Sequence, residues 1–135
     1  MAFERPIEVV MAFIGRINAH DVDGLCRLMS PDHVFVDAQG SRWQGVEAMR
    51  AAWTGYFQWF PDYRISHEQF LQNGNLVAVF GTASASRAVR ESSAQTNGWQ
   101  APAAWMAVVR DGLVAEWRVY ADNEGARRLL GGPKE

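Results

Sequence analysis

The stretch YRISHEQFLQNGNLVAVFGTASASR, residues 63–87, decides the fold. Two runs within it, 63–72 and 76–87, alternate their side chains with a period of two, which is typical of β-strands. Between them stands Asn73-Gly74-Asn75, a sequence that favours a tight turn. The stretch therefore predicts an antiparallel hairpin.

Two more runs of the same period follow downstream. Residues 99–110 and 113–121 alternate in the same way, and Asp111-Gly112 between them is a strong signal for a hairpin turn. The polar segment 88–98 is predicted to be a long hairpin connection. The C-terminal half is thus expected to form four antiparallel strands.

The N-terminal half has helical periodicity instead. Apolar residues recur at helical spacing over 6–17 and over 21–29, where Asp21 is suited to cap the helix. A third helix is predicted over 46–60, and one strand, 33–38, precedes it. Three helices followed by an antiparallel meander predict an α+β fold and a single domain over residues 1–135. The helices would cover one face of a curved, mainly antiparallel sheet and leave a cone with an open mouth.

Composition excludes several classes of protein. The net charge is -2, and the 12 Arg and one Lys are scattered, so neither nucleic acid nor an anionic membrane is an expected partner. The longest apolar stretches are much shorter than the ~20 residues of a membrane-spanning helix, and the N-terminus does not resemble a secretion signal. We therefore expect a cytoplasmic protein. Its single cysteine, Cys26, lies in an apolar helical pattern and is interpreted as a core residue.

Asp37 is the residue of the first strand that most invites a functional question. Strand alternation places His33, Phe35 and Asp37 on one face. Burying a carboxylate is costly, so an aspartate that faces an apolar cavity beside Phe35 would be suited to act as a general base. His33, expected near solvent at the start of the strand, could tune its charge. The alternative is that Asp37 simply opens the polar turn that continues to Ser41.

Four segments carry a resemblance to a known superfamily. They are Asn18 to Leu25, His33 to Gly40, Phe60-Pro61-Asp62 and Arg110 to Asp122. Together they resemble the nuclear transport factor 2-like superfamily, in its SnoaL-like and ketosteroid isomerase-like branch, over residues 7 to about 130. The resemblance implies a cone-shaped fold with a small-molecule pocket, and a homodimer formed through the sheets. Apolar residues on both faces of 99–109 fit burial of that strand on both sides.

The resemblance also implies roles for individual residues. Asp37 falls where ketosteroid isomerases keep the aspartate that moves a proton between carbon atoms. The two groups that donate hydrogen bonds to the substrate oxygen in those enzymes fall at Phe13 and near Ala104, and neither side chain can donate. Since loss of one such donor costs about 10²- to 10³-fold in rate, a steroid isomerase is not expected.

If the register matches the family, three strands supply the walls of an apolar pocket that suits an aromatic or polycyclic ligand. The same aromatic residues could instead simply fill a core. The predicted substrate-binding residues are Phe13, Phe35, Trp53, Phe57, Phe80, Thr82, Ser84, Met106, Trp117 and Val119, with Val108 and Ala121 beside them on the walls.

Further catalytic candidates lie on two other strands. Glu116, Arg118, Tyr120 and Asp122 share one face, which is typical of a solvated or dimer surface. The alternative is that Asp122, with Arg118, activates a water molecule as epoxide hydrolases of this superfamily do. His67 could reach the pocket wall or pack beneath it.

The chain has no sequence signature of a metal or cofactor site. It lacks paired histidines at metal-ligand spacing, a glycine-rich phosphate loop and a nucleophile elbow, so no metal and no cofactor is expected. The predicted function is acid-base chemistry on an apolar cyclic carbonyl compound, by isomerisation, aldol-type cyclisation or dehydration, with Asp37 as proton acceptor. The alternatives are a non-catalytic ligand-binding or accessory domain, and hydrolysis through Asp122 and Arg118.

Overall fold

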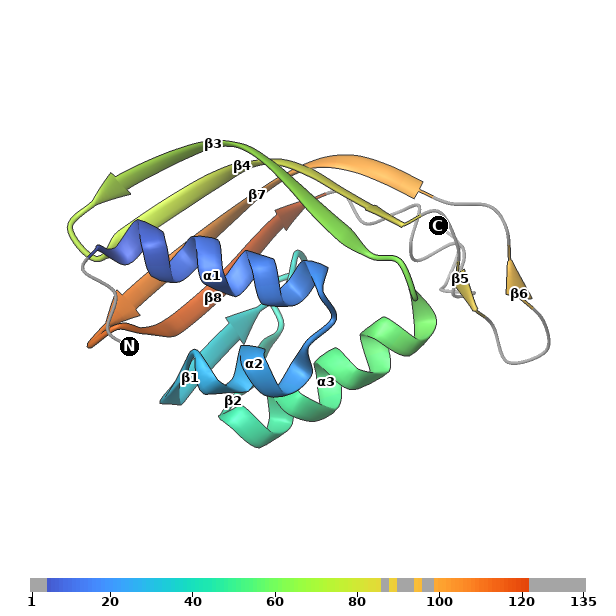
Figure 1. The fold of residues 1–135 in the computed structure, drawn as a ribbon, viewed down its shortest axis with the longest axis horizontal. Helices are drawn as coiled ribbons and strands as arrows, with labels where there is room; N and C mark the ends of the chain where they lie inside the picture. The colour runs from blue at the N-terminus through green and yellow to red at the C-terminus, as the bar shows by residue number, and fades with distance from the viewer. Residues whose placement is uncertain (1–4, 86–87, 90–93, 96–98, 122–135) are drawn as a thin grey trace.

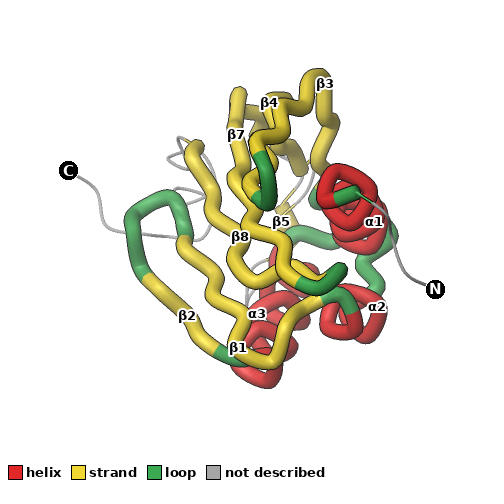
Figure 2. Tube along the Cα trace, turned by 90° about the vertical axis from the view of Figure 1, so that its left-hand side faces the viewer, coloured by secondary structure: helices red, strands yellow, loops and turns green. Residues whose placement is uncertain are grey.

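The computed structural model describes residues 5–85, 88–89, 94–95 and 99–121 (Figure 1). The helices and strands, in chain order, are α1 (Pro6–Asn18), α2 (Val22–Arg27), β1 (Met29–Val36), β2 (Arg42–Gln44), α3 (Val46–Trp59), β3 (Arg64–Asn73), β4 (Leu76–Ala85), β5 (Ala88–Val89), β6 (Ala94–Gln95), β7 (Trp99–Arg110) and β8 (Leu113–Ala121). Figures 1 and 2 show the main strands curving around the helices. The predicted α+β cone is confirmed.

Six strands form the main sheet in the order β2-β1-β8-β7-β4-β3. The hairpins β3–β4 and β7–β8 are antiparallel, as are the pairs β4–β7 and β1–β2. One pair, β1 with β8, is parallel, and β1 is the strand that comes from the helical half of the chain. The sheet is therefore mixed, although most of its pairs are antiparallel.

Local signals account for most element boundaries. Pro6 occupies the first turn of α1, and the Asp21 carboxylate caps α2 by accepting a hydrogen bond from the Gly24 N–H at 2.9 Å. Four elements differ from expectation, and two of them are the short strands β5 and β6, which pair antiparallel within the segment predicted to be a connection. β1 begins at Met29, earlier than predicted, with an irregular register against β8, and the exposed three-residue β2 lacks any alternation from which it could be predicted.

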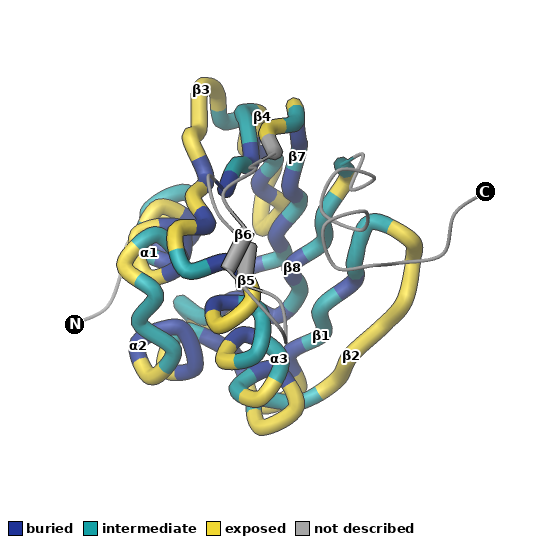
Figure 3. Tube along the Cα trace, turned by 90° about the vertical axis from the view of Figure 1, so that its right-hand side faces the viewer, coloured by how far each residue is buried: buried dark blue, intermediate teal, exposed yellow. Residues whose placement is uncertain are grey.

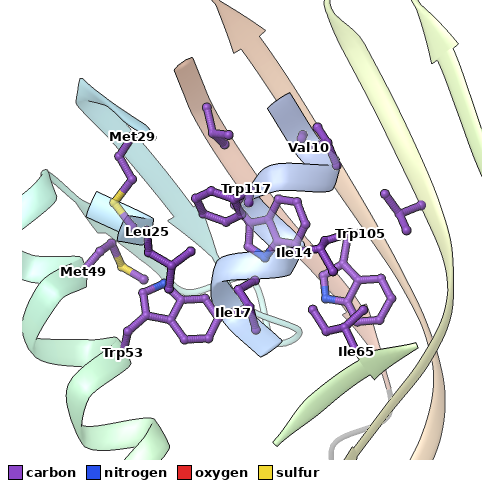
Figure 4. Packing of buried hydrophobic residues seen from close by; sticks show 14 of the residues in the cluster. Val10, Ile14, Ile17, Leu25, Met29, Met49, Trp53, Ile65, Trp105 and Trp117 are labelled. Atoms are coloured by element: carbon purple, nitrogen blue, oxygen red, sulfur yellow. The ribbon is translucent and has the colours of Figure 1, made fainter. Parts of the chain in front are cut away.

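The helices cover different parts of the concave face of the sheet. α1 packs against β3, β4, β7 and β8, whereas α3 packs against α2, β1 and β2. Figure 4 shows the α1 side of this core, with Trp117 and Trp105 near Ile14 and with Trp53 reaching in from α3. Cys26 is buried in the same core, as predicted. Residues of α3, β4, β7 and β8 together line a cavity.

Candidate functional site

A cavity of about 640 Å³ lies between α3 and the concave face of the sheet. Its walls come from α3, from the end of β1 with the turn that follows, from β2, and from inward-facing residues of β4, β7 and β8. Pockets of about 300 to 1,000 Å³ are typical of small-molecule sites. The cavity is therefore large enough for a ligand of two or three fused rings.

Small residues on α3 are the reason that the cavity exists. Four of them share one face of the helix at the spacing i, i+3, i+4, i+7, and all four line the cavity: Ala48, Ala51, Ala52 and Gly55. On the opposite wall, Ala83 and Ala121 are equally short. Helix and sheet are held apart elsewhere by larger side chains, so these short ones leave the space unfilled.

Aromatic rings make up most of the remaining wall: Phe35, Trp43, Trp53, Tyr56, Trp59, Tyr63, Trp105 and Trp117. Trp43 and Trp59 are also largely exposed, with 46% and 39% of their surface accessible, so they mark the opening of the cavity. Figure 3 shows that the edge strand β2, which carries Trp43, is exposed along its length. A flat apolar ligand would meet aromatic surface from the opening to the floor.

Asp37 is the one charged residue in the lining formed by the described residues. It follows the last residue of β1, and its Oδ1 accepts hydrogen bonds from the N–H groups of Gln39 and Ser41, each at 2.9 Å. Its own N–H donates to the Ser41 carbonyl at 3.0 Å. Asp37 therefore organises the turn, as one sequence-based interpretation expected, and it also lines the cavity, whereas its role as a base stays a prediction. Its Oδ2 has no hydrogen-bond or ion-pair partner in the described part of the chain.

Two phenols lie beside each other in the wall. The rings of Tyr56 and Tyr63 are 5.0 Å apart and nearly perpendicular. Burial raises the pKa of each hydroxyl well above its usual range, so both stay protonated at neutral pH. Tyr56 is half-buried, and its hydroxyl makes no hydrogen bond among the described residues. The lining therefore offers a neutral hydrogen-bond donor as well as a carboxylate.

Five of the residues expected on the pocket wall lie in the lining: Phe35, Trp53, Trp117, Val119 and Ala121. Five others lie on the outer face of the sheet, which corrects the expectation for them: Phe80, Thr82, Ser84, Met106 and Val108. The buried positions are Val77, Val79, Ala83 and Ala85 on β4, and Ala103, Trp105, Ala107 and Val109 on β7. Alternation failed here because β4 and β7 carry apolar side chains on both faces, so the pattern does not tell which face turns inward.

Two further wall candidates belong to the solid core instead of the cavity. Phe13 is fully buried against the Trp117 ring, with a centroid separation of 4.8 Å. Phe57 stacks on the His20 ring at 4.0 Å. Neither lines the cavity. Phe57 lies on the face of α3 that carries Met49 and Trp53, which turns toward the interior.

The histidines differ most from expectation. His67 is exposed on the edge strand β3, at a bulge that interrupts the alternation, and it lies outside the cavity. His33 was expected near solvent, but it is fully buried and contacts the Phe13 ring. Its Nδ1–H donates to the Val114 carbonyl at 2.7 Å, and burial lowers the pKa of the ring. His33 lies inside β1, which begins at Met29, and this part of the strand is buried because β8 pairs alongside it; the local sequence does not reveal that pairing.

The proposed water-activating pair is not assembled in the described structure. Arg118 lies on the outer face of β8, with its guanidinium carbon 5.4 Å from the centre of the Tyr120 ring. The neighbouring Trp117 and Val119 line the cavity on the opposite face. Asp122 falls outside the described residues. Arg118 is therefore on the wrong side of β8 to hold a water molecule in the cavity.

Several cavity residues were missed from the sequence, among them Trp43, Tyr56, Trp59 and Trp105. The sequence did carry one signal for the cavity, the small residues at helical spacing on α3. A helix face without large side chains predicts unfilled space beside it. Among the described residues, no three potential metal ligands come together. No helix in the described part of the chain combines the length and the apolar character needed to cross a bilayer.

Solved structures share this architecture. IdmH from Streptomyces antibioticus, a candidate polyketide cyclase, is 22% identical, with a TM-score of 0.79 over 95% of this chain and 99% of its own. A candidate SnoaL-like polyketide cyclase from Shewanella denitrificans OS-217 is 16% identical, with a TM-score of 0.81 over 93% and 96%. TerC, co-crystallised with polyporic acid, is 18% identical, with a TM-score of 0.75 over 94% and 98%. At these identities the likeness shows the fold.

Sequence comparison is more specific about the family. No functionally curated protein shows a significant match to this chain. The family model of the SnoaL-like domain, however, matches residues 10–117, which include most of α1, the cavity-lining helix α3 and most of the sheet. The chain therefore belongs to the SnoaL-like domain family.

Proposed function

We propose that the protein binds an apolar cyclic carbonyl compound in the cavity and moves a proton on it without a cofactor, with Asp37 as proton acceptor. The observation that carries this proposal is that Asp37 is the single charged residue among the described residues of a largely aromatic cavity lining. Titratable groups in such clefts are candidates for acid-base work. The structural relatives include candidate polyketide cyclases and a protein co-crystallised with polyporic acid, which supports a cyclic, oxygen-bearing ligand.

The chemistry follows from how Asp37 is held. Two backbone N–H groups hold Oδ1 in place, so Oδ2 is the oxygen with capacity for a proton. It would take a proton from the carbon next to the ligand carbonyl and leave an enolate. Returning that proton to another carbon completes an isomerisation. Attack of the enolate carbon on a second carbonyl of the same molecule closes a ring, and the proton then moves to the new alkoxide.

The first experiment is exchange of deuterium into a cyclic ketone, which reports proton removal without knowledge of the natural substrate. We expect the protein to accelerate exchange at the carbon next to the carbonyl of 2-tetralone, measured by proton NMR in heavy water. Asp37→Asn should lose most of this acceleration, on the order of 100-fold or more. The variant is well matched, because the amide oxygen of Asn can still accept the two backbone hydrogen bonds of the turn.

The control is Asp111→Asn, at the β7–β8 turn. Asp111 has a positive φ of 54°, a conformation that Asn also tolerates, and it lies outside the main cavity. Exchange at the buffer rate with the unaltered protein, while 2-tetralone still binds, would refute proton transfer by Asp37. That result would favour a non-catalytic binding domain. The Phe13 side chain, which cannot donate a hydrogen bond to a substrate oxygen, favours the same alternative.

We further propose that two copies pair through the outer face of the sheet. Four large apolar residues are exposed on that face: Leu71, Leu76, Phe80 and Tyr120. An apolar patch on one sheet face is typical of a protein–protein contact. Light scattering should report a dimer at micromolar concentration, and Phe80→Asp should shift it to monomer. Met11→Asp, an equally exposed apolar position on α1, should not. A monomeric unaltered protein would contradict the proposal.

A further inference from the structure

Neither of the two positions that correspond to the substrate-oxygen donors of ketosteroid isomerases lies in the cavity lining formed by the described residues, so any oxygen on a ligand needs a different partner. Phe13 lies in the core, and Ala104 lies on the outer face of β7, paired with Phe80 and Tyr120. An enolate or a polarised carbonyl without a donor is costly in an apolar cavity. The remaining question is which side chain of the lining can donate a hydrogen bond.

Tyr56 meets this requirement. The buried side-chain polar atoms without a partner in the described structure are His33 Nε2, Trp53 Nε1 and Trp117 Nε1. The Tyr56 hydroxyl also makes no hydrogen bond, yet it is not among these sealed atoms. It therefore keeps accessible surface, and its residue lines the cavity. A phenol of this kind donates to whatever acceptor enters.

The Tyr56 ring is also held firmly. Its centroid lies 5.0 Å from those of Phe60 and Tyr63, and 6.2 Å from that of Trp53. The contacts with Trp53 and Tyr63 are edge-to-face, with interplanar angles of 88° and 83°. Rings from three sides restrict the phenol to a narrow range of positions, so little conformational entropy is lost when a ligand binds.

We infer that the Tyr56 hydroxyl donates the hydrogen bond that holds the carbonyl oxygen of the ligand, and that the ligand class is a fused-ring ketone. The inference rests on the proposed function, since it assigns the partner of Asp37 in the same cavity. Asp37 enters from the end of β1 and Tyr56 from α3, so base and donor lie on different walls. A ligand between them could be held by its oxygen at Tyr56 and lose a proton to Asp37.

The test compares two bicyclic probes that differ in one carbonyl group, 1-tetralone and tetralin, bound to the full chain and to Tyr56→Phe. Affinity is measured by NMR titration of the indole N–H signals. We expect Tyr56→Phe to weaken the binding of 1-tetralone by about 3- to 10-fold, which corresponds to one neutral hydrogen bond, and the binding of tetralin by less than about 2-fold. Tyr120→Phe is the matched control, because it removes the same hydroxyl from the outer face of the sheet.

A second readout reports the hydrogen bond directly. The infrared carbonyl stretch of bound 1-tetralone should lie at lower frequency in the unaltered protein than in Tyr56→Phe. The role of Tyr56 would be overturned if Tyr56→Phe lowered the affinity for both probes equally. It would also be overturned if the affinity for both probes and the carbonyl stretch were unchanged. Either result would leave the binding of a ligand in the cavity intact. If the unaltered protein binds neither probe, the proposed function fails and the inference fails with it. Loss of deuterium exchange in Asp37→Asn, by contrast, does not bear on the donor.

Discussion

Burial of His33 should make the stability of the protein fall as the solution is acidified from about pH 8 to about pH 5. The ring is fully buried, its Nδ1–H donates to the Val114 carbonyl, and its Nε2 has no partner in the described structure. Burial lowers the pKa of the folded ring, because a charged imidazolium would lose its hydration there. The unfolded ring takes up a proton more readily, so its protonation favours unfolding.

The size of the effect follows from this difference. With an unfolded pKa of about 6.5, a ring that stays neutral in the folded state loses up to about 2 kcal/mol of stability by about pH 5. The contribution is complete above the unfolded pKa and is lost as the pH falls below it. For a domain of this size, 2 kcal/mol corresponds to a shift of about 1 M in the urea midpoint. That is a large part of a total stability of about 5 to 15 kcal/mol.

The assay is urea unfolding at several pH values for the unaltered protein, His33→Asn and His67→Asn. Asn removes the titration but keeps an N–H that can donate to Val114, whereas His67 is exposed and serves as the control. His33→Asn should lose up to about 2 kcal/mol of the pH dependence, and His67→Asn should retain it. The pH range lies above the titration of Asp32, because a hydrogen bond from the Ser30 hydroxyl lowers the pKa of that carboxyl. Any contribution of Asp32 to stability is therefore lost only at lower pH.

An equal pH dependence in His33→Asn and the unaltered protein would refute this reasoning. If His33→Asn does not fold, NMR of the unaltered protein decides the question. The His33 ring should keep its proton on Nδ1 and stay neutral below the pH at which an exposed imidazole takes up a proton. A folded ring that titrates near its ordinary value would refute the argument equally well.

Other substitutions test packing and backbone geometry by thermal and urea unfolding. Asn18→Ala should destabilise by about 2 kcal/mol, because the Asn18 amide donates to the Ile65 carbonyl at 2.9 Å and accepts from its N–H at 2.8 Å; a change below about 0.5 kcal/mol would contradict this. Gly81→Ala should destabilise by about 1 to 3 kcal/mol, because the added Cβ would meet backbone atoms of β3, and an unchanged midpoint would contradict the close approach. Gly15→Ala should instead stabilise by about 0.5 to 1 kcal/mol, since an exposed glycine inside α1 has open space around its Cα; any loss of stability would count against it.

Prediction from the sequence succeeded where the information is local. The hairpin turn at Asn73-Gly74-Asn75 and the Asp21 cap depend on neighbouring residues, and both are present. It failed on the orientation of β4 and β7, whose two faces are both apolar, so that Phe80 was placed inside although it lies outside. Local pattern cannot distinguish the core face of a sheet from its outer face when both are apolar.

The sequence by itself determined the elements, the α+β class and the special position of Asp37 at the end of a strand. Tertiary structure decided what surrounds that residue. The parallel pairing of β1 with β8, and the packing of α1 and α3 against different strands, bring together residues far apart in the chain, and these contacts create the cavity. A cavity is space that no side chain fills, so its size depends on the distance between α3 and the sheet. That distance cannot be predicted from the sequence periodicity of the helix or of the strands.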